Sequence, residues 1–372
     1  MGARGIPAPP PLARKAMHVV WPVVAVIVTG LLAPVVVVGS FLVAADRKAK
    51  VFRASCAAVL LLWVDIRMLV GCWALGSKHP DRTDAGWRRS HEQLLSSFLD
   101  SLMYYARRWL GLDVRLTDRM HFGTEGRPLI ALARHAGPFN SLAVAWLLAR
   151  TAGRLPRIVL AESLRWDPGL DTILTRLDSF FVPATSKPGN DRLEGVRRMA
   201  STLGPDDVFL IFPEGQNWTP SRRLKIIERL RQRGDEARAR RAQELRHVLP
   251  PMARGAWAAR SASPGADVMV IAHAGLGRLS SARLVWAALP FTDRPFLVKT
   301  WTYPAADVPD SQDEFAAWLD ARWSEVDAWV TANAGPWPEG HEPPGHGDEP
   351  VAGTWTDPGA SDPAGDGPRP ER

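Results

Sequence analysis

Cysteine is scarce in this sequence, and its scarcity excludes two ways of stabilising a fold. Only Cys56 and Cys72 are present among 372 residues, and both lie inside apolar segments. In such surroundings a cysteine packs as a small hydrophobic residue, so we expect neither a disulfide framework nor a metal site built from cysteine. This composition is compatible with a catalytic domain that faces the cytosol.

Also lacking are an internal repeat and a recognised nucleic-acid-binding motif. The 46 lysines and arginines exceed the 39 aspartates and glutamates, which gives a formal net charge of +7. Such a balance suits anionic lipid headgroups, phosphorylated substrates or nucleic acid, and by itself selects none of them. Because no basic stripe is interleaved with aromatic residues, nucleic acid is not expected as a partner.

The N-terminal part of the chain predicts membrane attachment. Residues 1–16 are rich in Pro and Ala and predict a short disordered leader. The stretch Met17–Ala45 then carries no Asp, Glu, Lys or Arg, and it is longer than the ~20 helical residues that cross a ~30 Å hydrocarbon core. It is too long for the apolar region of a signal peptide. We therefore predict that residues 17–76 form a pair of membrane-associated helices.

A second apolar run, Ala54–Leu75, is interrupted by Asp65 and Arg67. Charges are costly at mid-bilayer depth, and residues two apart do not share a helical face, so these side chains need other partners or a shallow position. Two geometries remain open, a spanning hairpin or one span followed by an interfacial helix. Basic residues flank both runs, so the positive-inside rule does not choose between them.

Residues 77–335 have the pattern of one globular unit, which we predict to be the catalytic domain. Short apolar runs end in Gly, Pro or Asn and alternate with helical stretches. This alternation is typical of an α/β fold with a central, mostly parallel mixed sheet flanked by helices, and ligands bind such sheets at the carboxyl ends of the strands. The predicted strands are 128–133, 157–161, 179–182, 208–212 and 268–272, followed by a last strand near 301 and a helix to 330.

Two segments have an unusual charge. The helical stretch Arg222–His247 is dense in basic residues and should break at Gly234. It suits anionic headgroups, the phosphates of CoA or the acidic face of a carrier protein, and it also fits a solvated helical hairpin with interleaved acidic residues. Residues 336–372 are rich in Pro, Gly, Asp and Glu and have no periodicity, which predicts a disordered acidic tail.

The first chemical signal is the segment Arg134–Ser141, directly after a predicted strand and before a helix that we expect over 142–150. A histidine on such a turn faces a cleft, and its reference pKa near ~6.5 keeps it mostly neutral at pH 7, so His135 fits a general base. A plainer interpretation is also open, in which His135 is a turn residue and Asn140 is the N-cap of the following helix.

The second signal is Phe212-Pro213-Glu214-Gly215-Gln216-Asn217, again at the end of a buried strand. A glutamate held between Pro and Gly at a strand end is poised to bind hydroxyl groups or pair with a cation. The alternative is a salt-bridged loop carboxylate. Together the two signals are more specific than either alone.

With these blocks the sequence resembles the glycerophospholipid acyltransferase family, typified by 1-acylglycerol-3-phosphate acyltransferases, and within it the actinobacterial-type members. The resemblance covers nearly all of residues 80–335. In that family the first block is His followed by Asp, matched here by His135 and Asn140, and a later block is Phe-Pro-Glu-Gly-Thr-Arg, matched by residues 212–217. Further likeness lies in residues 157–160, 164–171, 247–251 and 270–273.

The resemblance implies transfer of a fatty acyl group from acyl-CoA or acyl carrier protein to a lysophospholipid hydroxyl, with His135 as the general base. Such assistance contributes ~10²–10⁴-fold. Pro213, Glu214, Gly215, Gln216 and Asn217 are then expected to hold the acceptor at a membrane, and no metal or other cofactor is implied.

The sequence departs from the family at two places. Asn140 stands where the family has a carboxylate that orients the imidazole, and an amide can fix orientation but supplies no negative charge. Asp167 and Asp171 are the candidates for a substitute. The arginine of the family's later block is replaced by Asn217, and Arg222 and Arg223 are the nearby candidates for binding an acceptor phosphate. These departures keep open a second hypothesis, a catalytically weakened or inactive lipid-binding protein on the same fold.

Overall fold

The computed structural model describes residues 6–42, 49–79, 81–82, 85–153, 155–184, 190–205, 207–277, 279 and 281–335. The predicted acidic tail, residues 336–372, lies outside the described residues, and so do residues 1–5 of the predicted leader.

A seven-stranded sheet forms the centre of the fold, in the order β1-β7-β6-β2-β5-β3-β4. Neighbouring strands are parallel except β6 and β7, which are antiparallel. The expected mostly parallel mixed sheet is thereby confirmed. The strands are β1 Val114–Leu116, β2 Leu129–Ala133, β3 Pro156–Ala161, β4 Phe180–Val182, β5 Val208–Ile211, β6 Asp267–Ala274 and β7 Phe296–Tyr303.

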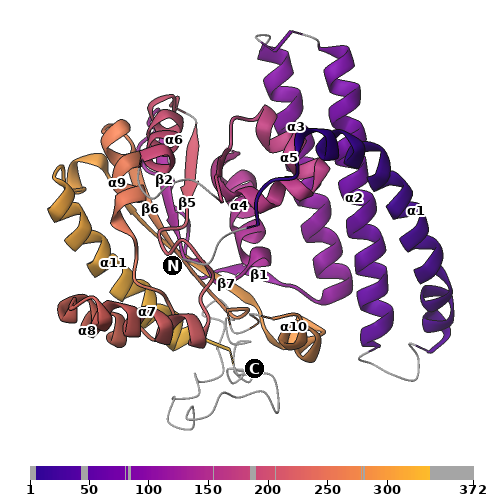
Figure 1. Cartoon of the computed structure of the whole chain (residues 1–372). Helices are drawn as coiled ribbons and strands as arrows, with labels where there is room; N and C mark the ends of the chain where they lie inside the picture. The colour runs from indigo at the N-terminus through magenta and orange to yellow at the C-terminus, as the bar shows by residue number, and fades with distance from the viewer. Residues whose placement is uncertain are drawn as a thin grey trace, which may run out of the picture.

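Helices cover both faces of the sheet (Figure 1). Because side chains alternate along a strand, Ile130 and Leu132 of β2 enter one core while Leu129 and Ala131 enter another. The first core is closed by α6, α9 and α11, and the second by α4 and α10. The helices of the globular part are α3 Ala85–Tyr105, α4 Pro138–Ala152, α5 Pro168–Arg176, α6 Asn190–Ser201, α7 Pro220–Gln232, α8 Glu236–Glu244, α9 Ala253–Ala262, α10 Ala282–Ala288 and α11 Gln312–Asn333.

Short turns join these elements. They are the π-helical turn η1 Ala106–Leu110 and the 3-10 turns η2 Glu162–Trp166, η3 Phe291–Asp293 and η4 Ala305–Asp307. Gly234, with φ 73°, separates α7 from α8 as predicted, because a left-handed backbone conformation suits glycine and ends the helix.

Several element boundaries differ from the sequence prediction. The edge strand β1 was not predicted, because three residues, of which two are exposed, are too few to form a recognisable apolar pattern. Helix α4 begins at Pro138 and not near Leu142, since proline is well suited to a first helical turn. The expectation that Asn140 is the N-cap of this helix is therefore wrong.

The two N-terminal helices are α1 Pro11–Leu42 and α2 Lys50–Lys78. Residues 11–16, predicted as leader, thus belong to α1, and Arg14 pairs with Asp171 of α5 with Nε at 2.7 Å from the carboxylate. Both helices are long and apolar enough to cross a membrane. Along α1, large apolar side chains such as Val23, Ile27 and Leu31 are exposed.

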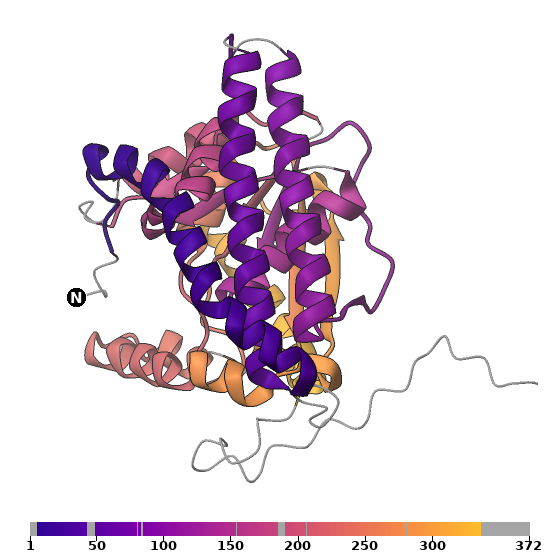
Figure 2. The ribbon, with the colours of Figure 1, turned by 90° about the vertical axis from the view of Figure 1, so that its right-hand side faces the viewer.

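Helix α2 lies alongside α1 and α3 (Figure 2). The charges that interrupt its apolar run have partners within this layer. Asp65 is buried and accepts a hydrogen bond from Trp21 Nε1 at 2.6 Å, and Arg67 donates to Ser97 O and to Ser101 Oγ at 3.1 and 2.8 Å. Packing against α1 and α3 therefore supplies the partners that the sequence left open.

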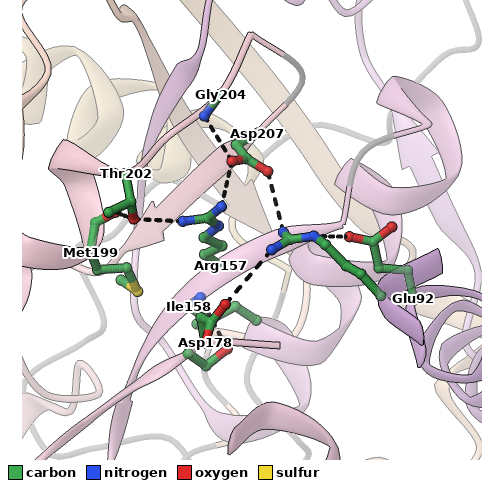
Figure 3. Close-up of polar contacts among 10 residues, drawn as sticks. Glu92, Arg157, Ile158, Asp178, Met199, Thr202, Gly204 and Asp207 are labelled. Atoms are coloured by element: carbon green, nitrogen blue, oxygen red, sulfur yellow. Dashed lines mark hydrogen bonds and ion pairs between the residues drawn. The ribbon is translucent and has the colours of Figure 1, made fainter. Parts of the chain in front are cut away.

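A polar cluster lies where β3 and β5 begin (Figure 3). Arg157, the second residue of β3, donates to Asp207 at 2.7 Å and to Thr202 at 2.8 Å. Asp207, directly before β5, also accepts from the backbone N–H of Gly204 at 2.8 Å. These contacts tie the start of two neighbouring strands together, at the end of the sheet opposite to His135.

Candidate active site

The candidate site lies where β2, β5 and β6 end. The register pairs Leu129 of β2 with Val208 of β5 and with Asp267 of β6, so the three strands run side by side in one direction. His135 follows β2 by two residues and Glu214 follows β5 by three. The parallel pairing therefore brings the two predicted blocks to one edge of the sheet, as the sequence predicted.

His135 is held chiefly through its main chain. Its backbone N–H donates to Glu214 Oε1 at 2.9 Å, and its carbonyl accepts from the backbone N–H of Trp218 at 2.7 Å. Its ring lies against Phe212, with 4.6 Å between the ring centroids. The loop after β5 thus fixes both the backbone and the ring face of the histidine.

Ser141, at the start of α4, contacts the His135 ring. Its Oγ lies 3.3 Å from His135 Nδ1 and 3.4 Å from the carbonyl oxygen of Gly137. A hydroxyl that donates to the carbonyl can accept from Nδ1–H, so this arrangement fits the tautomer in which Nδ1 carries the proton. The other ring nitrogen, Nε2, is then free to accept a proton, as a general base must.

Asn140 does not occupy the role that the sequence suggested. It is 3% exposed, and its Nδ2 atom has no hydrogen-bond partner among the described residues. The residue that contacts Nδ1 of His135 is its neighbour Ser141. Because α4 begins at Pro138, the side chain of Asn140 belongs to the first helical turn and is not the partner of the imidazole.

Glu214 lies beneath this loop, 3% exposed. One carboxylate oxygen accepts from the backbone N–H of His135, and the other accepts from the backbone N–H of Leu249 at 2.9 Å. Burial raises the pKa of Glu214 to about 7, against the opposing effect of the Arg134 charge and the two backbone donors. The carboxylate therefore joins the His135 loop to the segment around Leu249.

Arg134 is the second buried charge of the site, at 1% exposure. Its guanidinium donates to the carbonyl of His247 at 2.7 Å and to the carbonyl of His273 at 2.7 Å. Burial lowers the pKa of Arg134 to about 10, and the charges of Glu214 and Asp327 oppose the shift. Arg134 consequently remains protonated at neutral pH and links the loop after β2 to the end of β6 and to the segment that precedes α9.

Asp327 of α11 holds the segment that Arg134 and Glu214 also contact. Its Oδ1 accepts from the backbone N–H groups of His247 at 2.6 Å and Val248 at 3.1 Å, and both of its oxygens accept from Arg246 N. A carboxylate that accepts several backbone donors holds a turn firmly. The segment 246–249 is thus fixed by Asp327, Arg134 and Glu214 together.

Burial and nearby positive charges disfavour the charged form of the His135 imidazole. Burial lowers the pKa of His135 to about 4, and the positive charges of Arg222 and Arg134 add to the shift. The ring is therefore neutral at pH 7, as a proton acceptor must be. The charge of Arg222, a predicted site residue, therefore helps to keep the imidazole neutral.

The two candidate arginines differ in their surroundings. Arg222 is exposed and donates to the carbonyl of Asn217 at 2.9 Å. Arg223 donates to the carbonyl oxygens of Leu245 and, at 2.6 Å, Gln243, so it ties α7 to the end of α8. Of the two, Arg222 is the one whose charge lowers the pKa of His135.

The remaining predicted residues line the turn between β5 and α7. Pro213 is buried and its carbonyl accepts from the backbone N–H of Met252 at 2.8 Å. Gly215 has φ 66°, a conformation that glycine adopts without strain, and a Cβ there would lie 2.1 Å from Met252 Cε. Gln216 and Asn217 are half-buried. All of these residues lie in one short turn beside His135.

Neither Asp167 nor Asp171, the two candidates for a substitute carboxylate, contacts His135. Asp167 caps α5 by accepting from Leu170 N at 2.8 Å. Asp171 pairs with Arg14 and, at 2.8 Å, with Arg165. Both carboxylates are therefore engaged beside the N-terminal helices and not at His135. Within the described part of the chain, no group of three His, Cys, Asp or Glu side chains could hold a metal ion.

Sequence reasoning missed three residues of this site. Ser141 could have been noticed, because it follows the first block directly. Arg134 also adjoins His135, but a charge beside a buried strand does not reveal that it is itself buried. Asp327 has no local signal, since its role depends on α11 packing against a segment about eighty residues away in the chain.

Comparison with known proteins finds a family model and a solved structure that resemble the chain. The family model described as "Acyltransferase" matches residues 113–253, which include His135, Glu214 and Arg222. Among solved structures, the chain is similar to that of the 1-acyl-sn-glycerophosphate (LPA) acyltransferase PlsC from Thermotoga maritima. That similarity has a TM-score of 0.47 and 14% identity, over 77% of this chain and 99% of that chain. A search of curated protein sequences finds no match.

Proposed function

We propose that this protein is a membrane-attached acyltransferase that moves a fatty acyl group from acyl-CoA or acyl carrier protein to the hydroxyl of a lysophospholipid such as 1-acylglycerol-3-phosphate. The observation that carries the proposal is a neutral His135 at the carboxyl end of a central parallel strand, inside the segment that matches the acyltransferase family model. The catalytic unit is residues 77–335, and its blocks resemble the actinobacterial-type members of that family.

In the reaction, Nε2 of His135 removes the proton of the acceptor hydroxyl as its oxygen attacks the thioester carbonyl. The carbon–oxygen bond forms, the carbon–sulfur bond breaks, and the thiolate leaves. The imidazolium then returns its proton to the thiolate, so the histidine is regenerated and the products are an ester and a thiol. Ser141 supports this cycle by accepting from Nδ1–H, which keeps Nε2 available.

The acceptor is expected to bind over the turn at residues 213–217 and to place its phosphate against Arg222. Arg222 is the exposed arginine that acts electrostatically on His135, and arginine binds phosphate oxygens in a bidentate way. Glu214 acts from below, through the backbone of His135. We assign Glu214 to positioning the histidine, and Gln216 and Asn217 to contacting the glycerol part of the acceptor.

Membrane attachment is assigned to α1 and α2. Their exposed apolar side chains and their length fit a hydrocarbon environment, and a lysophospholipid acceptor partitions into the same membrane. The catalytic domain is then expected on the cytoplasmic side, where acyl thioesters are available.

The test uses the full chain purified in detergent, with labelled acyl-CoA or acyl carrier protein and a panel of lysophospholipids. The wild-type protein is expected to form a diacyl product, and His135→Ala is expected to lose at least ~10²-fold of the rate. Arg223→Gln is the matched control beside the site. Equal product from His135→Ala would exclude His135 as the base.

A second candidate function is a lipid-binding protein that has lost catalysis, favoured by the unpartnered amide of Asn140. It predicts lipid association without turnover in the same assay. His135-dependent acylation by the unmodified chain would exclude it, and activity that appears only in Asn140→Asp would support it.

A further inference from the structure

A groove with apolar walls lies between α1 and α2, where both helices meet the π-helical turn η1; we call it the α1–α2 groove. Its volume is about 460 Å³, within the range of ~300–1,000 Å³ that is typical of ligand pockets. The walls are formed by residues that include Val37 and Phe41 of α1, Phe52 and Val59 of α2, and Trp109 of η1. Phe41 is 79% and Val37 57% exposed, so the groove opens onto the apolar outer surface of α1.

One end of the α1–α2 groove is basic. Ser40, Phe52 and Trp109 also border an adjoining hollow of about 220 Å³, which is lined in addition by Arg53 and Arg108. The α1–α2 groove therefore opens directly into a hollow that is bounded by the guanidinium groups of Arg53 and Arg108. Neither arginine takes part in the hydrogen bonds that hold His135 and Glu214.

In the part of the chain that the structure describes, neither Arg53 nor Arg108 has a carboxylate as counter-ion. Arg53 Nη1 reaches only the carbonyl of Trp109, at 3.5 Å, and its Nε is buried without a hydrogen-bond partner. Arg108 lies over the ring of Trp109, 4.7 Å from its centroid. Buried donors of this kind normally have partners, so this end of the groove is suited to an anion.

We infer that the α1–α2 groove binds an anionic phospholipid of the surrounding membrane, with an acyl chain along Val37, Phe52 and Val59 and the phosphate held by Arg53 and Arg108. Apolar walls exclude a polar solute, and paired guanidinium groups match phosphate oxygens. Trp109 borders both the apolar groove and the basic hollow, as tryptophan does at the boundary of hydrocarbon and headgroups. Basic pockets between membrane helices bind lipid headgroups in this way.

The bound lipid has a structural consequence for the proposed enzyme. Lys50, at the start of α2, donates to the carbonyl oxygens of Trp286 and Ala287 at the end of α10, at 3.3 and 2.9 Å. A phospholipid that bridges α1, α2 and η1 stabilises this contact between the membrane helices and the catalytic domain. The inference rests on the membrane attachment proposed above, and it does not require the acyltransferase activity.

The experiment measures lipid binding by native mass spectrometry of the full chain in neutral detergent, titrated with phosphatidylglycerol or phosphatidylcholine. The wild-type protein is expected to retain one phosphatidylglycerol in preference to phosphatidylcholine. Arg108→Gln, which removes an exposed positive charge from the adjoining hollow, should weaken phosphatidylglycerol binding about fivefold, the equivalent of one arginine near a headgroup. Arg107→Gln is the matched control, because the adjacent arginine is exposed and does not line the groove.

A second variant, Val37→Trp, fills the apolar part and is expected to reduce binding of both lipids. The inference is overturned if Arg108→Gln binds phosphatidylglycerol as tightly as the wild-type protein, or if Arg107→Gln loses as much. It is also overturned if Arg108→Gln raises the KM for the lysophospholipid acceptor, since the groove would then be part of the substrate site.

His135→Ala separates this inference from the proposed function. We expect that variant to bind phosphatidylglycerol like the wild-type protein while it forms no diacyl product. Lipid retention by a wild-type chain without turnover would support the groove and refute the enzyme. Turnover without selective lipid retention would refute the groove alone.

Discussion

Removal of the Arg222 charge should raise the pKa of His135 and move the acidic limb of the pH–rate profile toward neutral pH. Burial is the largest cause of the lowered pKa, and Arg222 is the next. Because Arg222 is exposed and its guanidinium donates to the carbonyl of Asn217, Arg222→Gln should leave the fold intact. The change then acts on the electrostatic environment of His135.

The magnitude follows from the fraction of His135 that is unprotonated. With a pKa of about 4, about 97% of the histidine is a competent base at pH 5.5, whereas a pKa of ~6.5 would leave about 9%. The wild-type kcat/KM should therefore be nearly constant from pH 7 down to about pH 5 and fall only near pH 4. Arg222→Gln should begin to lose activity at a higher pH than the wild-type protein does.

The assay is the pH dependence of kcat/KM for the wild-type protein, Arg222→Gln and Arg223→Gln, with a monoacylglycerol acceptor, which carries no phosphate, so that phosphate binding does not interfere. Arg223 is the control because its contacts are to Gln243 and Leu245. An acidic limb near pH 6.5 in the wild-type protein, or identical limbs in all three proteins, would refute the reasoning.

Three further substitutions test the support of the His135 loop. Glu214→Gln places an amide N–H against a backbone donor and should lower the free energy of unfolding by ~1–3 kcal/mol. Because burial raises the folded-state pKa of Glu214 to about 7, the favourable contribution of Glu214 to stability is full below pH ~4.5 and declines as the pH rises through 7. Denaturant titration should therefore find a larger loss of stability in this variant at pH 5 than at pH 8. Ser141→Ala should lower kcat by ~2–10-fold while Ser141→Thr retains it, measured in the acylation assay, because one neutral hydrogen bond is lost. Asp327→Ala leaves the backbone N–H groups of Arg246, His247 and Val248 without their acceptor. It should lower the free energy of unfolding by more than ~3 kcal/mol, measured by thermal or denaturant unfolding.

Much of this architecture could be predicted from local pattern. The strands that carry the site are short apolar runs that end in turn residues, and their positions agree with β2 and β5 to within one residue. Because parallel strands place their carboxyl ends together, two separate sequence blocks could be assigned to one site before any geometry was known. His135 and Glu214 are adjacent for that reason.

The partners of those residues could not be predicted in the same way. Which side chain reaches Nδ1 of His135 depends on where α4 begins, and a shift of the first helical turn exchanges Asn140 for Ser141. The contacts of Glu214 with Leu249, and of Asp327 with the same segment, depend on tertiary packing between elements far apart in the chain. Residue type reveals a charge but not whether that charge will be buried.

The position of His135 is fixed through its backbone, and this has a consequence for catalysis. The negative charge of Glu214 is directed at main-chain N–H groups, so it does not contact the ring and cannot offset the charges of Arg222 and Arg134 at the imidazole.

A base with a pKa of about 4 is weaker than one matched to neutral pH. An acceptor whose phosphate binds Arg222 neutralises one cause of that low pKa and thereby strengthens the base. A phosphate-bearing acceptor should therefore raise kcat, and not only lower KM, relative to a monoacylglycerol, which carries no phosphate, and Arg222→Gln should abolish this difference in kcat. Equal kcat values for the two acceptors in the wild-type protein would contradict this coupling.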